Sequence, residues 1–225
     1  MKRKGKVKAQ AQWWLGLGLA LALAYLGWAL VIKPTSFPTP ELPGYPCPGK
    51  SDTYSANDIS VTYRASGCAG LTSGHAVDVA HTFGRLDHAL QQLRLPPLPR
   101  GLRVGLYTGR AGYELLGQPG GPRAIVIRTS SRKHSLQAEM LAHRAFAELA
   151  LQEAAPGLDE RSRRALAGAL AVIASQNDDV ARSLALTLNA HERRALGLLT
   201  RHGPFYLSEM LERRCRDHCR WRPLG

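Results

Sequence analysis

The feature that most constrains this 225-residue chain is an uncharged run of twenty residues, Trp13 to Ile32, which is rich in Leu, Ala and Gly. A helix rises about 1.5 Å per residue, so the run is long enough to cross the roughly 30 Å hydrocarbon core of a bilayer. It therefore predicts a single transmembrane helix.

Basic residues before the apolar run indicate its orientation. They are Lys2, Arg3, Lys4, Lys6 and Lys8. Because such residues stay on the cytoplasmic side, residues 1–12 are expected to form a basic cytoplasmic tail of a single-pass inner or plasma membrane protein, with the main domain periplasmic or otherwise extracytoplasmic. A cleaved signal peptide has the same order of charge and hydropathy. An anchor is favoured because the run is longer than a typical signal core and no good small-x-small site follows it before the prolines begin at Pro34.

The net charge of +13 raises the question of nucleic-acid binding. Much of the excess lies in the N-terminal cluster and in residues 212–225, which we expect to be a basic C-terminal tail. A basic patch interleaved with aromatic residues is not apparent. We therefore expect the membrane and a protein or peptide as partners, and no nucleic acid, while the sequence leaves a small-molecule substrate open.

Residues 33–50 contain six prolines between Pro34 and Pro48 and show no periodicity. Proline-rich segments favour extended polyproline conformations and act as semi-rigid spacers. This composition predicts a linker that separates the anchor from the domain.

All four cysteines, Cys47, Cys68, Cys215 and Cys219, follow the apolar run. An even number in an oxidising compartment favours disulfides, and the most local of the three possible connectivities joins Cys47 to Cys68 and Cys215 to Cys219. A metal site at Cys215–Cys219 remains an alternative, although its spacing matches neither a zinc finger nor haem attachment.

Hydropathy patterns divide the remaining chain into strands followed by helices. Apolar residues recur every three or four positions between His75 and Leu93, which is typical of an amphipathic helix. Strands are expected at 59–63, 101–107 and 124–129, a short helix at 113–116, a helix at 136–151, and helices thereafter with breaks at 156–157, 176–177, 189 and 203–204. The predicted fold class is α+β, with a small mixed sheet followed by a helical bundle in residues 51–211.

The helix at 136–151 begins with the sequence A-E-M-L-A-H, Ala138 to His143. Glu139 and His143 are four residues apart and therefore share one face of the helix. In zinc metallopeptidases, a helix carrying H-E-x-x-H binds the metal through two histidines and uses the glutamate as general base. Ala138 to His143 is thus the candidate catalytic stretch.

The order of elements resembles the gluzincin-type, or peptidase MA-like, zinc metallopeptidases. In that family a small sheet precedes the H-E-x-x-H helix, and a later helix supplies a glutamate ligand from a W-L-x-E-G-L-A-x-Y-like motif. Residues 93–113, 124–149 and 164–175 carry the resemblance. It implies a zincin-like fold for the domain.

The resemblance also assigns site residues. It places Glu139 as the general base and His143 as the second histidine ligand, while Ala138 replaces the first ligand and Gly168 replaces the third. Two of the three ligands are then missing, so Glu139 and His143 are interpreted as vestigial. We expect no cofactor and, on balance, no enzymatic activity.

The leading hypothesis is a membrane-anchored extracytoplasmic pseudo-peptidase that acts as a binding or scaffold protein. Ile125, Val126 and Ile127 are expected to form an edge strand to which a peptide adds by β-augmentation. One alternative is an accessory or assembly subunit of a membrane complex. A second is an active metallopeptidase with a rearranged zinc site, in which His134, His191 or His202 would supply ligands.

Overall fold

Five strands form one mixed sheet in the order β1-β2-β3-β5-β4 in a computed structural model that describes residues 39–45, 50–64, 71–130, 135–203 and 205–214. β1 (Asp52–Ala56) and β2 (Ile59–Tyr63) make an antiparallel hairpin. Its two-residue turn has φ of 51° at Asn57 and 62° at Asp58. Asn and Asp tolerate this left-handed region better than most residues, which explains the tight hairpin.

The other three strands complete the sheet. β3 (Leu102–Thr108) runs parallel to β2 on one side and to β5 (Ala124–Thr129) on the other. β4 (Gly112–Leu116) pairs antiparallel with β5, with Tyr113 opposite Ile127. The edges of the described sheet are therefore β1 and β4.

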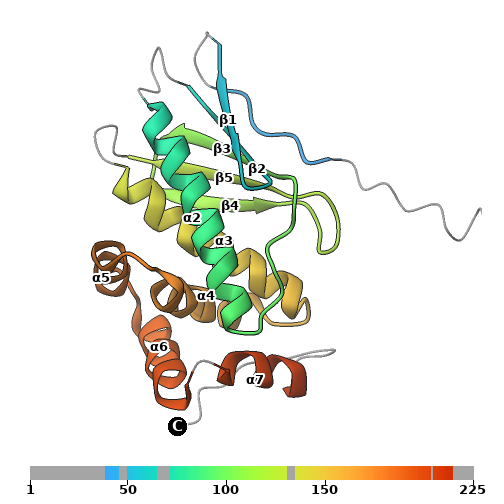
Figure 1. The fold of residues 1–225 in the computed structure, drawn as a ribbon, viewed down its shortest axis with the longest axis vertical. Helices are drawn as coiled ribbons and strands as arrows, with labels where there is room; N and C mark the ends of the chain where they lie inside the picture. The colour runs from blue at the N-terminus through green and yellow to red at the C-terminus, as the bar shows by residue number, and fades with distance from the viewer. Residues whose placement is uncertain (1–38, 46–49, 65–70, 131–134, 204, 215–225) are drawn as a thin grey trace, which may run out of the picture. The chain divides into compact units, whose positions relative to one another are not determined.

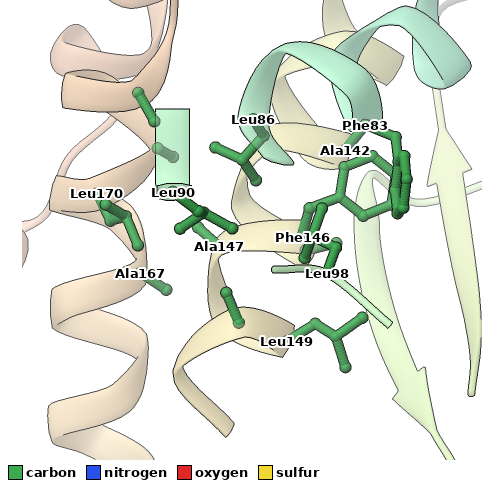
Figure 2. Close-up of a cluster of buried hydrophobic side chains, with 14 of the residues drawn as sticks. Phe83, Leu86, Leu90, Leu98, Ala142, Phe146, Ala147, Leu149, Ala167 and Leu170 are labelled. Atoms are coloured by element: carbon green, nitrogen blue, oxygen red, sulfur yellow. The ribbon is translucent and has the colours of Figure 1, made fainter. Parts of the chain in front are cut away.

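Two long helices cover one face of the sheet (Figure 1). α2 (Ser73–Gln92) contacts β1 and β2, and α3 (Leu136–Ala154) contacts β4 and β5. Phe83 of α2 meets Phe146 of α3 edge to face, with ring centroids 5.5 Å apart (Figure 2). Because both rings are buried, this contact anchors the two helices to each other above the sheet.

The C-terminal part is a helical bundle made of α4 (Glu160–Ala174), α5 (Asp178–Leu186), α6 (Ala190–His202) and α7 (Tyr206–Arg214). α4 packs against α3 on one side and against α6 on the other. Buried alanines such as Ala147 and Ala167 allow close approach of α3 and α4 (Figure 2).

Residues 39–45 lie on the sheet face opposite the helices, which corrects the prediction that all of residues 33–50 form a spacer. The Tyr45 hydroxyl donates to the carbonyl oxygens of Thr62, at 2.7 Å, and Leu106, at 2.9 Å. Its ring stacks on Tyr107 at 4.4 Å, and Tyr107 occupies space left by Gly105, where a Cβ would lie 2.5 Å from the Tyr107 ring. Proline content predicts extended backbone, but it does not say whether that backbone lies free or on a surface.

The predicted α+β class with a mixed sheet is confirmed. The predicted short helix at 113–116 is wrong, because these residues form β4. Tyr113 and Leu115 pack against the core while Glu114 is exposed, which is the two-residue alternation of a strand.

The predicted edge strand is also wrong. Ile125, Val126 and Ile127 lie in β5, which is hydrogen-bonded to β3 on one side and to β4 on the other. All three side chains are fully buried. A run that is apolar at every position is typical of an interior strand covered on both faces. This apolar pattern, and not the position of β5 as the last described strand in the sequence, indicates where the strand lies in the sheet.

Several predictions fall outside the described residues. They are the transmembrane helix at 13–32, the four cysteines and most of the basic C-terminal tail. Within the described ranges, no helix combines the length and the hydropathy that crossing a membrane would require.

Candidate functional site

Glu139 lies in the first turn of α3 and points at α2. Its Oε1 accepts a hydrogen bond from Nη2 of Arg85 at 2.5 Å. The residue is only 7% exposed. Burial raises the pKa of the Glu139 carboxyl, and Arg85 opposes this rise. The carboxylate is therefore held in the α2–α3 interface.

His143 lies one turn further along α3 and has no exposed surface. Its Nδ1 is 3.0 Å from the Glu139 carbonyl oxygen. A carbonyl can only accept, so Nδ1 carries the proton and the lone pair is on Nε2, which is buried and has no hydrogen-bond partner. Burial lowers the pKa of His143 to about 4, so the imidazole is neutral at pH 7.

The register of the zinc motif must be corrected. In H-E-x-x-H the histidines are four residues apart, whereas His143 follows Ala138 by five. The residue four positions after Ala138 is Ala142, and both alanines are fully buried. A register that starts at His143 instead puts Arg144 at the glutamate and Ala147 at the second histidine. Neither register supplies two histidines.

Gly168 of α4, assigned to the third ligand, faces a carboxylate from another helix. A Cβ on Gly168 would lie 2.6 Å from Oε1 of Glu192, so the absence of a side chain makes room for this group. Glu192 belongs to the first turn of α6 and is 5% exposed. Its Oε2 accepts the backbone N–H of Asn189 at 2.7 Å, and Asn189 in turn caps α6.

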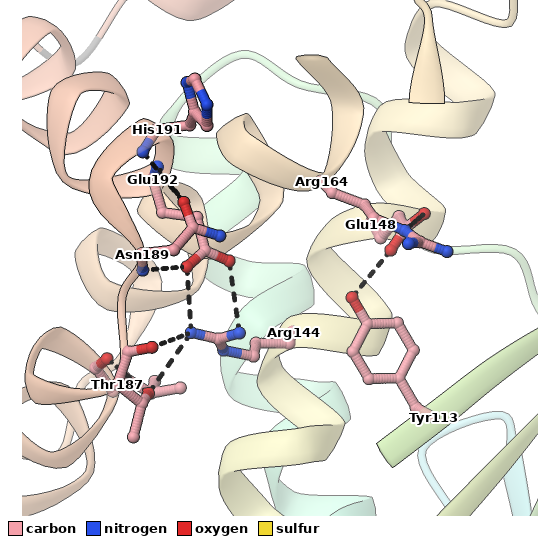
Figure 3. A network of polar contacts seen from close by, with 9 residues as sticks. Tyr113, Arg144, Glu148, Arg164, Thr187, Asn189, His191 and Glu192 are labelled. Carbon is pink, nitrogen blue, oxygen red and sulfur yellow. Dashed lines mark hydrogen bonds and ion pairs between the residues drawn. The ribbon is translucent and has the colours of Figure 1, made fainter. Parts of the chain in front are cut away.

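Arg144 of α3 completes this contact. Its Nη1 is 3.2 Å from Oε1 of Glu192, and its Nη2 reaches the carbonyl oxygen and the hydroxyl of Thr187 (Figure 3). The ion pair therefore joins α3 and α6 beside Gly168 of α4. A guanidinium at this point repels a divalent cation.

A second polar group links the edge strand to the helices. The Tyr113 hydroxyl of β4 donates to Oε2 of Glu148 on α3 at 2.7 Å (Figure 3). Oε1 of Glu148 lies 3.3 Å from Nε of Arg163 and 4.0 Å from Nε of Arg164, both on α4. Burial, together with the Glu148 charge, raises the pKa of Tyr113, so its hydroxyl stays protonated and acts as a donor.

The donors present do not fit a zinc site. Among the described residues, no group of three or more His, Cys, Asp and Glu side chains is arranged to hold a metal ion. His191 contacts Arg161, and His202 stacks on Tyr206. His134 lies outside the described residues.

Sequence reasoning missed Tyr113, Arg144, Glu148 and Glu192. Asn189 and Glu192 have the spacing of a capping box, so the start of α6 was readable, but the contact of Glu192 with Gly168, 24 positions earlier, was not. Comparisons of the chain with protein-family models, curated proteins and solved structures gave no match. Function is therefore inferred from the side chains of this chain alone.

Proposed function

We propose that this chain is a membrane-anchored, extracytoplasmic binding or scaffold protein whose degenerate gluzincin-like domain holds an extended peptide without cleaving it. The observation that carries the proposal is the position of the Glu192 carboxylate. It lies beside Gly168, where a side chain would otherwise be, and it forms an ion pair with Arg144. An internal ion pair takes the place that the family resemblance gives to a metal ligand.

Zinc hydrolysis needs three protein ligands and an open position where the metal activates water. Ala138 and Ala142 offer no donor atoms, and the single imidazole of His143 is sealed in the core. A general base must also reach the water that it deprotonates. Glu139 is instead tied to Arg85. These features favour binding over catalysis.

β4 is the strand that we propose for peptide binding, in place of β5. Among the described strands it pairs with β5 alone, and Gly112 to Leu116 present their other edge. In an antiparallel ladder, alternate residues direct their N–H and C=O groups away from the partner, so these groups can pair with an added strand. The peptide would become a sixth strand of the sheet.

The membrane belongs to the same proposal. Trp13 to Ile32 would anchor the chain, with residues 1–12 in the cytoplasm and the domain on the other side, where Cys47, Cys68, Cys215 and Cys219 could form disulfides. The zincin-like character of the domain is likewise proposed, supported by the order of strands ahead of α3 and α4.

Hydrogen exchange on the full chain tests the binding strand. Short linear peptides would be selected by phage display against the detergent-solubilised chain, and amide exchange would be followed by mass spectrometry with and without a selected peptide. We expect new protection in Gly112–Leu116, because its outward amides would gain partners. β1 is the internal control, since it is the other edge of the described sheet. Protection in β1 alone, protection away from both edges, or failure to select any peptide would overturn the proposal.

A further inference from the structure

Side chains alternate across β4, and an added strand would continue this alternation. Tyr113 and Leu115 face the helices, whereas Glu114 faces the other side and pairs with Arg128 of β5 at 3.5 Å. Every second side chain of a bound peptide would therefore point toward the ends of α3 and α4 that flank Tyr113.

Two carboxylates and two guanidinium groups lie on that side, so their charges balance. Glu148 lies between the Tyr113 hydroxyl and the guanidinium groups of Arg163 and Arg164, and Glu160 pairs with Arg164. Arg144 and Arg164 both oppose the rise in the Tyr113 pKa, which indicates that both charges act on the hydroxyl. Arg144 is paired with Glu192, and the side chains of Arg144 and Arg163 are largely buried, so Arg164 is the most exposed of these three guanidinium groups.

Arg164 is well placed to change partners. Its side chain is 65% exposed, and its closest partner is the equally exposed Glu160, one turn earlier on α4, at 2.6 Å. Exposed pairs of this kind contribute little to stability, so an incoming carboxylate can compete with Glu160.

A surface hollow of about 520 Å³ adjoins Arg164 between the starts of α4 and α6. In its lining, Asp159 accepts the backbone N–H and the hydroxyl of Ser162, and Arg161 contacts His191. Of the two arginines in the lining, Arg164 is the one that Glu148 links to Tyr113 of β4, so it is the arginine that a carboxylate on the β4 side would meet.

From this arrangement we infer that the peptide held at β4 carries an acidic residue, Asp or Glu, on its helix-facing side, and that its carboxylate pairs with Arg164. The inference rests on the proposed function, because it specifies the partner of the same strand. Glu160 is the internal competitor of the peptide carboxylate.

Two substitutions with opposite expected effects test the inference. A fluorescein-labelled selected peptide would be compared with its Asp-to-Asn or Glu-to-Gln form by anisotropy on the full chain. Arg164→Gln should weaken binding of the acidic peptide about threefold to fivefold, and Glu160→Gln should strengthen it about twofold. Neither change should alter binding of the amide form. Arg182→Gln is the matched control, because Arg182 lies in an exposed pair on α5.

The outcomes separate this inference from the proposed function. If peptides protect β4 but Arg164→Gln leaves the affinity for the acidic peptide unchanged, or if selected peptides lack acidic residues, the carboxylate inference fails and β4 binding stands. Weaker binding with Glu160→Gln would contradict the competition. If no peptide protects β4, both proposals fail.

Discussion

The two sides of α3 differ in how their charged groups are satisfied. Toward α2, Glu139 pairs with Arg85, while the buried Nε atom of Arg85 and the Nε2 atom of His143 have no hydrogen-bond partner. Toward α4, α6 and β4, Glu148 and Glu192 each have several partners. Glu139 and His143, which resemble a catalytic motif in the sequence, are buried between α3 and α2. Glu148 and Glu192, which belong to no motif, form the polar network on the side of α3 next to the edge strand β4.

This difference has a physical consequence. Buried titratable groups without full hydrogen bonding tie stability to their protonation states. Groups with several hydrogen-bond and ion-pair partners instead make stability depend on the positions of the side chains around them. The α2 side should therefore respond strongly to pH and to loss of a charge, while the α4–α6 side should respond to changes in shape.

The largest expected effect is a loss of folding stability at acid pH, and it should come from the α2 side of α3. The pKa of His143 is about 4 in the folded chain and about 6.5 in the unfolded chain, so the unfolded state binds the proton first. Stability is full above pH 6.5, and about 3 kcal/mol should be lost as the pH falls to 4. The lowered pKa of His75 adds to this loss, whereas the raised pKa of Glu139 opposes it.

Urea unfolding of the full chain between pH 7 and 4 measures this loss. His143→Gln is the control, because glutamine does not titrate. The variant should lose less stability over the same range, whatever its stability at pH 7. Equal losses in both proteins would show that His143 is not the titrating group.

Loss of the Arg85 charge should have the next largest effect. Arg85→Met leaves the Glu139 carboxylate buried without its cation, which should cost about 2 kcal/mol at pH 7 after allowance for the one-third exposure of Arg85. Urea unfolding checks this value. Adding Glu139→Gln should recover part of the loss. Arg182→Met, in an exposed pair, should change stability by less than about 0.5 kcal/mol. Similar losses for Arg85→Met and Arg182→Met would contradict the burial of Glu139.

The smallest effect on stability is expected on the other side of α3, and its sign should depend on whether Glu192 is present. Gly168→Ala should cost about 1 kcal/mol, because the new Cβ forces the Glu192 side chain away, and this loss exceeds the gain in helix propensity. In a Glu192→Ala background the same change should stabilise by about 1 kcal/mol. Gly197→Ala in α6 is the matched control, because a Cβ there meets no other atom within 4 Å and should stabilise the chain. Thermal unfolding measures these changes in stability. Equal effects of Gly168→Ala with and without Glu192 would disprove the contact between Gly168 and Glu192.

Parts of the fold could be predicted because local periodicity determines them. The apolar spacing of α2 and the β-branched residues of β5 were sufficient to identify each element. β4 was missed because a five-residue strand that begins with Gly112 and is followed by Gly117 carries little periodic signal. Residues 39–45 were assigned to a linker because composition cannot show that Tyr45 finds a partner in Tyr107.

The candidate site was harder to predict for a related reason. Glu139 and His143 attracted attention through a motif whose spacing they do not match. The network on the other side of α3 depends on contacts between distant positions, such as Tyr113 with Glu148 and Gly168 with Glu192. Only the folded chain brings these residues together.

The central claim is that the domain binds a peptide at β4 without metal catalysis, and one assay tests the absence of metal catalysis most directly. The full chain, purified without chelators, would be analysed for bound zinc by mass spectrometry and for cleavage of casein, beside the Glu139→Gln variant. We predict less than stoichiometric zinc and no cleavage above that of the variant. One zinc per chain, together with casein cleavage that Glu139→Gln abolishes, would contradict the account.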